Sequence, residues 1–342
     1  MISIAVIGCG AWGPNHIRIF GSLPESRVDV AVDVDPQRLE RMRALYPALR
    51  VDRDAMAVLD DPGIDAVVVA TPTSTHYDLV RRALAAGKHV LAEKPLARTV
   101  AETEELRRLA RERGRMLMVG HVFLFNPGIM KLKEEIEAGA VGEPLFLSAV
   151  RTNLGPVRSD VNAAYDLATH DLSIFNWLVG CEPERASAAG ASFLQPGVED
   201  VVSISLTYPR GIFATIQASW LNPKKVRQIT VVGRLGMMIW DDLELSNPVR
   251  VYAKRAEAAA AYSDYGGFLR ISMSDGDVRF PSVELEEPLR TQARCFLARI
   301  RDGAREERAD AAEAVKVVRS LEAIERSLKA GGTPVPVGGG ER

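Results

Sequence analysis

The chain has 342 residues, with 43 Lys plus Arg, 45 Asp plus Glu and a formal net charge of −2. At about 150 residues per domain, this length predicts two domains with separate cores. The near-neutral charge gives no overall field for binding nucleic acid or an anionic membrane, so we expect neither as a partner. Hydrophobic residues make up 47% and charged residues 26% of the chain, as in ordinary globular proteins, which excludes disorder for most of it.

Cysteine usage and the first residues bear on the compartment. The 3 cysteines are Cys9, Cys181 and Cys295. Their spacing matches neither a disulfide framework nor a zinc site, so we expect no metal and a reducing compartment. The apolar residues 2–7 lack a preceding basic region and end too early for a signal peptide or a membrane span of about 20 residues. We therefore predict a cytoplasmic protein.

Up to about residue 120, short β-branched runs alternate with amphipathic stretches, the pattern of a doubly wound parallel sheet. The predicted strands are 2–7, 28–34, 66–70, 89–92 and 116–119, and the predicted helices are 38–45, 78–86 and 100–113. The strands are apolar without alternation, as expected for strands buried on both faces. Residues 1–122 are therefore predicted to form an α/β Rossmann domain.

Beyond about residue 126, apolar and polar residues alternate along adjoining segments, which indicates an antiparallel sheet with one wetter face. Residues 202–208 and 212–220 show this alternation on either side of a Pro-Arg-Gly turn. We predict an α+β domain with an open antiparallel sheet over 123–330, serving substrate binding and oligomerisation. Residues 331–342 are rich in Pro and Gly and are predicted to be a flexible tail.

A glycine-rich turn follows the first predicted strand. Gly8, Gly10 and Gly13 form a GxGxxG whose glycines allow a tight turn, close approach of the backbone to a pyrophosphate, and close helix packing. Asp33 ends the second strand, where a carboxylate takes the adenosine ribose hydroxyls and repels a 2′-phosphate. This pattern predicts NAD as the cofactor. The predicted contacts here are Gly8, Gly10, Ala11, Trp12, Gly13 and Asp33.

Two further motifs follow strands of the same predicted sheet. Residues 71–76 read Thr-Pro-Thr-Ser-Thr-His, and residues 93–95 read Glu-Lys-Pro. Both lie at carboxyl ends of parallel strands, where open α/β folds bind ligands. The predicted cofactor contacts in these motifs are Thr71, Pro72, Thr73, His76, Glu93 and Lys94.

Farther along, Asp166 and His170 stand four residues apart, on one face of a helix. Oxidation of a secondary alcohol needs a hydride acceptor on carbon and a proton acceptor on oxygen. Histidine, with an ordinary pKa of about 6.5, suits the second task, and Lys94 is able to stabilise an alkoxide or take the proton itself. The residues leave open which of His170 and Lys94 accepts the proton.

These motifs, in this order, resemble the Gfo/Idh/MocA family of NAD(P)-dependent oxidoreductases, in which a Rossmann domain precedes an open antiparallel sheet domain. The resemblance covers nearly the whole chain. It implies that Lys94 contacts substrate and nicotinamide ribose, and that Asp166 and His170 hold the substrate hydroxyl and exchange its proton. It also implies a homodimer or homotetramer.

Several stretches resemble the nucleotide-sugar branch of this family, especially the UDP-N-acetylglucosamine 3-dehydrogenases. They are residues 13–15, 125–127, 153–155, 158–162, 165–167 and 220–225. Thr169 stands where that branch has a proline. The resemblance implies oxidation of a UDP-N-acetylamino sugar, at its C3 hydroxyl, to a ketone.

A site for a diphosphate needs the side-chain donors of arginine or lysine. Arg151 and Arg158 are the candidates, and each is equally consistent with a surface or interface residue. Asn126 and Asn153 are candidates for sugar hydroxyls, or equally caps of local turns, and His170 completes the predicted substrate contacts. One alternative is a dehydrogenase or reductase of a free sugar, inositol or keto sugar. Another is a catalytically silent NAD-sensing regulator, although such a protein would not need the catalytic set.

Overall fold

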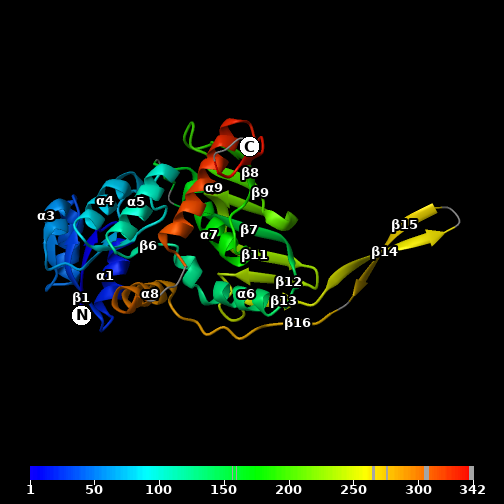
Figure 1. The fold of residues 1–342 in the computed structure, drawn as a ribbon, viewed down its shortest axis with the longest axis horizontal. Coiled ribbons are helices and arrows are strands. Elements are labelled where there is room, and N and C mark those ends of the chain that lie inside the picture. The colour runs from blue at the N-terminus through cyan, green and yellow to red at the C-terminus, as the bar shows by residue number, and fades with distance from the viewer. Residues whose placement is uncertain (156, 159, 264–265, 275, 304–307, 339–342) are drawn as a thin grey trace. The chain divides into compact units, whose positions relative to one another are not determined.

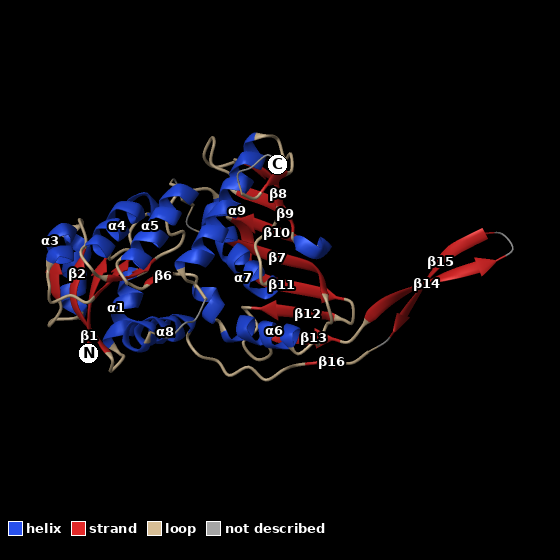
Figure 2. Ribbon diagram, viewed as in Figure 1, coloured by secondary structure: helices blue, strands red, loops and turns tan. Residues whose placement is uncertain are grey.

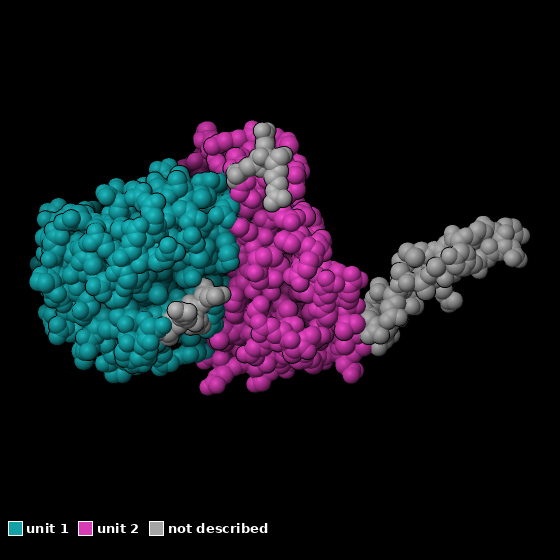
Figure 3. Space-filling view, viewed as in Figure 1, with its two compact units in different colours: residues 1–126, 286–322 teal, residues 127–285, 323–342 magenta. Residues whose placement is uncertain are grey.

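The computed structural model describes residues 1–342 except 156, 159, 264–265, 275, 304–307 and 339–342. The chain divides into two compact units, coloured separately in Figure 3. Unit 1 comprises residues 1–126 and 286–322, and unit 2 comprises residues 127–285 and 323–342.

Unit 1 contains a six-stranded parallel sheet in the order β3-β2-β1-β4-β5-β6 (Figure 2). Its strands are β1 Ile2–Ile7, β2 Ser26–Val32, β3 Arg50–Asp52, β4 Ala66–Val69, β5 His89–Ala92 and β6 Leu117–Val119. Its helices include α1 Gly13–Gly21, α2 Pro36–Leu45, α3 Ala55–Asp60, α4 His76–Ala85, α5 Val100–Glu112 and α8 Pro288–Asp302. The predicted doubly wound sheet is confirmed.

The sheet of unit 1 is buried on both faces, which explains its continuous apolar strands: every residue of β4 is fully buried. Helix starts follow local capping. Asp35 accepts a hydrogen bond from the backbone of α2, and Thr99 forms a capping box with Glu102 at the start of α5. The short elements β3 and α3 were not predicted, because neither is long enough to show a hydrophobic period.

Unit 2 contains a nine-stranded sheet in the order β16-β13-β12-β11-β7-β10-β9-β8-β17 (Figure 1). Its strands are β7 Pro144–Leu154, β8 Arg185–Ala191, β9 Val201–Thr207, β10 Phe213–Ser219, β11 Leu221–Gly233, β12 Met237–Asp241, β13 Val249–Tyr252, β16 Val278–Arg279 and β17 Val335–Pro336. Its helices include α6 Pro127–Glu137, the π-helix η3 Ala164–Ala168 and α7 Thr169–Val179. Strands β14 Arg255–Ser263 and β15 Gly266–Ser274 form a separate two-stranded sheet.

The predicted open sheet is confirmed in a mixed, mostly antiparallel form. β10 pairs with β9 antiparallel, joined by the predicted turn, but with β7 parallel. Along β9, Val202, Ile204 and Leu206 are buried, whereas Ser203 and Thr207 are exposed, as the alternation predicts.

The contact-based division differs from the expected boundary at residue 122. It falls at residue 126, and residues 286–322 join unit 1. Helix α8 explains the second difference, because its apolar face packs on α1. Phe296 meets Phe20 edge to face at 6.2 Å, and the Gln292 side chain donates to the Val119 carbonyl at 3.2 Å.

The flexible tail predicted for residues 331–342 is wrong over residues 332–337; residues 339–342 lie outside the described part. Val335 pairs with Ala186 at the edge of the sheet, and the Val337 N–H donates to the Glu184 carbonyl at 2.9 Å. The composition was misleading because an edge strand is held by backbone hydrogen bonds and needs few apolar side chains.

α9 Ala311–Lys329 continues from unit 1 into unit 2. Among the helices in the described ranges, none combines the length and the apolar character needed to cross a membrane.

Candidate active site

The glycine loop after β1 lies in a backbone environment that leaves no space for side chains at two of its glycines. Gly8 has a φ of +98°, and a Cβ there would lie 2.5 Å from the Ala70 carbonyl oxygen. A Cβ on Gly13 would lie 1.8 Å from the Gly8 carbonyl oxygen. Both contacts are shorter than any real Cβ makes, so this tight turn into α1 requires glycine. The loop has the geometry of a dinucleotide cradle at a helix N-terminus.

The carboxylate of Asp33 lies beside this loop, and the residue is only 6% exposed. Its Oδ2 accepts the Cys9 N–H at 2.7 Å, and its Oδ1 accepts the Asp35 N–H at 2.9 Å. The Arg38 guanidinium lies 3.5 Å from Oδ2. Burial, with the Asp33 charge, raises the pKa of the Cys9 thiol to about 12, so the thiol is inert.

Around the loop, Ala11 and Trp12 are exposed, Trp12 by 40%. Gly10 is open enough that the first atom a Cβ would meet is the Arg38 side chain at 3.6 Å. The Asp33 side chain just after β2 suits the ribose hydroxyls of NAD, and the open backbone before α1 suits its pyrophosphate.

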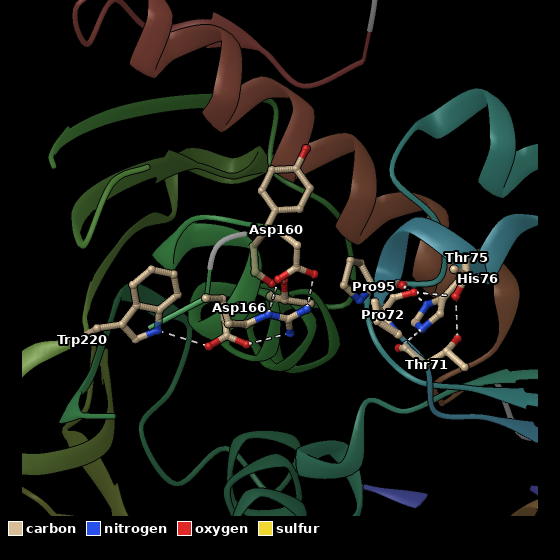
Figure 4. Close-up of polar contacts among 11 residues, drawn as sticks. Thr71, Pro72, Thr75, His76, Pro95, Asp160, Asp166 and Trp220 are labelled. Carbon is tan, nitrogen blue, oxygen red and sulfur yellow. Dashed lines mark hydrogen bonds and ion pairs between the residues drawn. The ribbon is translucent and has the colours of Figure 1, made fainter. Parts of the chain in front are cut away.

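The motif after β4 is tied to the motif after β5 by His76. The ring is 1% exposed, with Nδ1 2.9 Å from the Pro95 carbonyl oxygen and Nε2 2.9 Å from the Thr71 carbonyl oxygen (Figure 4). The Thr75 hydroxyl donates to Pro72 O at 2.8 Å, closing the same turn. His76 therefore holds the loops after β4 and β5 together, which is a structural role. Its predicted contact with the cofactor stays a prediction. Thr73, in the loop after β4, is 4% exposed.

Lys94 follows β5 and is 9% exposed, and the Lys94–Pro95 peptide bond is cis. The neighbouring Glu93 carboxylate accepts from His16 Nε2 at 3.0 Å. Burial opposes ionisation of Glu93, but the hydrogen bond and charge of His16, with the charge of Lys94, lower its pKa overall. Glu93 thus supplies a fixed negative charge beside Lys94.

His121 follows β6 and completes this cluster of unit 1. Its side chain is buried, and neither ring nitrogen has a hydrogen-bond partner among the described residues. Burial is the main cause that lowers the pKa of His121 to about 4, and the charge of Lys94 lowers it further. The charge of Glu93 raises it by a smaller amount. The imidazole is therefore neutral at neutral pH.

In unit 2, Asp166 lies in η3 and both of its carboxylate oxygens are engaged. The Trp220 indole Nε1–H donates to Oδ2 at 3.2 Å, and Arg158 Nη1 lies 3.4 Å from Oδ1 (Figure 4). Arg158 in turn donates to Asp160 at 2.9 Å and 2.6 Å, and this hydrogen bonding raises the guanidinium pKa despite burial. The carboxylate is held between an indole and a cation.

The start of η3 is fixed by Asn162, whose carbonyl accepts the Asp166 N–H at 3.1 Å and whose side chain accepts the Tyr165 N–H at 3.2 Å. Its amide donates to Glu199 at 2.9 Å. The next element, α7, carries His170, which is 9% exposed. Asp166 and His170 thus lie in two consecutive helical elements, a π-helix and an α-helix, where the spacing predicted one face of a single helix.

Arg151 forms a buried ion pair with Asp171. Asn153 and Asn126 are partly buried, at the end of β7 and before α6. Their predicted substrate contacts, like that of Arg151, stay predictions.

The structure thus groups the predicted residues by unit. Unit 1 holds the glycine loop, Asp33, the 71–76 motif and Lys94; unit 2 holds Asp166, His170 and Arg158. Trp220 was not predicted as a site residue, because a single tryptophan after an alternating strand is typical of a position in the hydrophobic core. No group of His, Cys, Asp and Glu within the described ranges has an arrangement suited to a metal.

Two family models match parts of the chain. A family model described as "Oxidoreductase family, NAD-binding Rossmann fold" matches residues 2–121, and the "GFO/IDH/MocA C-terminal domain" model matches residues 129–239. Inositol 2-dehydrogenase 2 of Paenarthrobacter aurescens is 32% identical over 63% of this chain and 68% of its own. The scyllo-inositol 2-dehydrogenase (NAD(+)) of Bacillus subtilis is 29% identical over 65% and 68%.

Among solved structures, UDP-N-acetylglucosamine 3-dehydrogenase GnnA from Acidithiobacillus ferrooxidans shares the fold, with a TM-score of 0.81 and 24% identity over 96% of this chain and 98% of that one. The predicted family, fold class and NAD cofactor are confirmed by these matches. The chain therefore belongs to the Gfo/Idh/MocA family and is an NAD-dependent dehydrogenase.

Proposed function

We propose that the protein oxidises a secondary hydroxyl of a sugar-like substrate to a ketone. The hydride, with its electron pair, leaves carbon for NAD, and the hydroxyl proton passes to His170 or Lys94. One observation carries this proposal: Asp166 is held on both oxygens one helical element before His170. A fixed carboxylate and a neighbouring imidazole suit the orientation of a hydroxyl and the removal of its proton.

For the substrate itself, we propose a UDP-N-acetylamino sugar oxidised at C3. The supporting observations are the stretches that resemble the nucleotide-sugar branch and the place of Arg158. The Arg158 side chain is 30% exposed and lies beside Asp166. A bound diphosphate would therefore be able to replace Asp160 as the partner of the Arg158 guanidinium group. Asn126, Asn153 and His170 are the proposed contacts to the sugar.

A free polyol such as inositol is the second candidate, favoured by two observations. The relatives compared above include inositol dehydrogenases. In addition, both arginines expected to bind a diphosphate already have carboxylate partners, Asp171 for Arg151 and Asp160 for Arg158. A neutral polyol requires neither pair to open.

The deciding experiment incubates the purified protein with NAD and a panel of UDP-sugars and free polyols, following NADH absorbance and substrate mass together. A UDP-N-acetylated sugar that loses two hydrogens supports the first substrate. Reaction of free polyols alone removes the proposed role of Arg158. If nothing reacts while NAD still binds, both proposed substrates fail and the alternative of an NAD-sensing regulator is favoured.

The catalytic residues are tested with the substrate found. His170→Asn and Lys94→Met should each lower kcat by roughly 100- to 10,000-fold if that residue moves the proton, with NAD binding retained. His89→Asn is the matched control: His89 begins β5, its Nδ1 accepts the Met116 N–H, and its loss should leave kcat within about twofold. Unchanged turnover in His170→Asn would discard that role.

A further inference from the structure

Trp220 lies between β10 and β11, and its side chain is 1% exposed. An indole has one polar group, the Nε1–H, and no acceptor. That single donor is directed at Oδ2 of Asp166 at 3.2 Å (Figure 4). A buried indole N–H needs one acceptor, and here the acceptor is a carboxylate of the candidate active site.

The backbone of Trp220 is itself anchored to the backbone of a second loop. The Trp220 N–H donates to the Asp200 carbonyl at 3.0 Å. Asp200 is fully buried, and its carboxylate accepts the backbone N–H of Leu194 at 2.8 Å, and that of Phe193 as well. The backbone position of Trp220 is therefore fixed by a buried loop of unit 2, and the indole that it carries is itself buried.

Arg158, the partner of the other oxygen, is a weaker constraint. It lies 3.4 Å from Oδ1, is 30% exposed and is shared with Asp160. Of Trp220 and Arg158, the indole is the more deeply buried group.

We propose that Trp220 is a positioning residue for the dehydrogenation: its N–H fixes the rotation of the Asp166 carboxylate, so that Oδ1 is left to face Arg158 and ligand. The inference rests on the proposed function, because it requires that Asp166 take part in the reaction. Trp220 touches no reacting atom; it acts through Asp166. A phenylalanine at this position fills most of the volume but lacks the donor.

Trp220→Phe is the test, with Trp240→Phe as the matched control. Trp240 is also 1% exposed and lies in β12 of the same sheet. Trp220→Phe should lower kcat by roughly 10- to 100-fold, the worth of a hydrogen bond to a charged group, with the Kd for NAD within about twofold. Trp240→Phe should lower the melting temperature about as much as Trp220→Phe does, and should keep kcat within about threefold of the wild-type value. Equal effects on kcat in both variants overturn the proposal.

A double-mutant cycle separates this proposal from the one on which it rests. In an Asp166→Ala background, Trp220→Phe should have no further effect on kcat, because its only route to the reaction has been removed. Additive losses mean a role independent of Asp166 and overturn the proposal. If Asp166→Ala alone leaves kcat unchanged, the proposed role of Asp166 fails, whatever Trp220→Phe does.

A spectroscopic measurement covers the case in which Trp220→Phe does not fold. With ¹⁵N-labelled indoles, Asp166→Asn should move one indole N–H signal upfield and speed its exchange with water, since a carboxylate acceptor becomes an amide. The signal is assigned by elimination with Trp12→Phe, Trp177→Phe and Trp240→Phe. If the Trp220 signal is unmoved by Asp166→Asn, the hydrogen bond is absent in solution and the proposal is overturned.

Discussion

Arg151 and Asp171 form a buried ion pair through two hydrogen bonds, Nε to Oδ2 at 2.9 Å and Nη2 to Oδ1 at 2.7 Å. The side chains are 4% and 1% exposed. This bidentate geometry joins β7 to α7, the helix that carries His170. The ion pair therefore holds α7 in place against β7. Breaking it would leave two buried charges without a partner and without water.

Arg151→Met should therefore lower the free energy of unfolding by about 3–5 kcal/mol, because Asp171 is left buried and unpaired. Denaturant unfolding at pH 7 measures this change. Arg151→Met/Asp171→Leu should recover much of the loss, since an apolar pair of similar volume needs no partner. A stable Arg151→Met protein with a raised KM only for UDP-sugars would instead support diphosphate binding by Arg151.

Gly13→Ala should abolish NAD binding, because the new Cβ would lie 1.8 Å from the Gly8 carbonyl and force the loop open. Gly21→Ala is the control in the same helix: a Cβ there meets nothing within 4 Å. It should stabilise the protein slightly, by roughly 0.5–1 kcal/mol from helix propensity, and leave NAD binding intact. Calorimetric titration with NAD distinguishes the two variants. Normal affinity in Gly13→Ala would contradict the cradle.

Asp33→Ser should lower the preference for NAD over NADP by roughly 10- to 100-fold in kcat/KM, because a carboxylate that repels the 2′-phosphate is removed while Arg38 stays. Asp54→Ser is a suitable control, since Asp54 caps α3 and serine also caps helices. The ratio is measured by initial rates with each cofactor. An unchanged ratio in Asp33→Ser would remove Asp33 as the discriminating residue.

Because His121 is buried, we expect the free energy of unfolding to fall at acid pH. Its pKa is about 4 in the folded protein, below the ordinary 6.5, so between these values the unfolded chain binds a proton that the folded chain does not. Stability is then lost as the pH falls from about 7 towards 4, by about 2 kcal/mol at pH 5 for this residue.

Denaturant unfolding at pH 7 and pH 5 measures this loss. His121→Phe should lose less stability than the wild type over this interval, because phenylalanine does not titrate. Lys94 and Glu93, the charged groups that act on His121, are the same in both proteins, so the difference isolates the imidazole. Identical pH dependence in the two proteins would contradict a neutral, buried His121.

The sequence by itself determined whatever depends on neighbours along the chain. Apolar runs such as Val67–Val69 and the alternation through Ile204 gave the strands, and the spacing of Gly8 and Gly13 gave the cofactor loop, because periodicity and turn chemistry are local. Asp166 and His170 were predicted as site residues for the same reason, because a spacing of four is local to the chain. The structure places them in two consecutive helical elements, η3 and α7.

Tertiary structure alone decided which partners these side chains have. Asp171 lies 20 residues from Arg151, and Trp220 lies 54 residues from Asp166. Neither separation along the chain carries a pattern. Arg151 meets Asp171 only when α7 packs on β7, and Trp220 meets Asp166 only when the end of β10 lies beside η3. Whether an arginine serves a ligand or a buried carboxylate, and whether a tryptophan is core or orients a carboxylate, is fixed by packing and the need to satisfy buried polar groups.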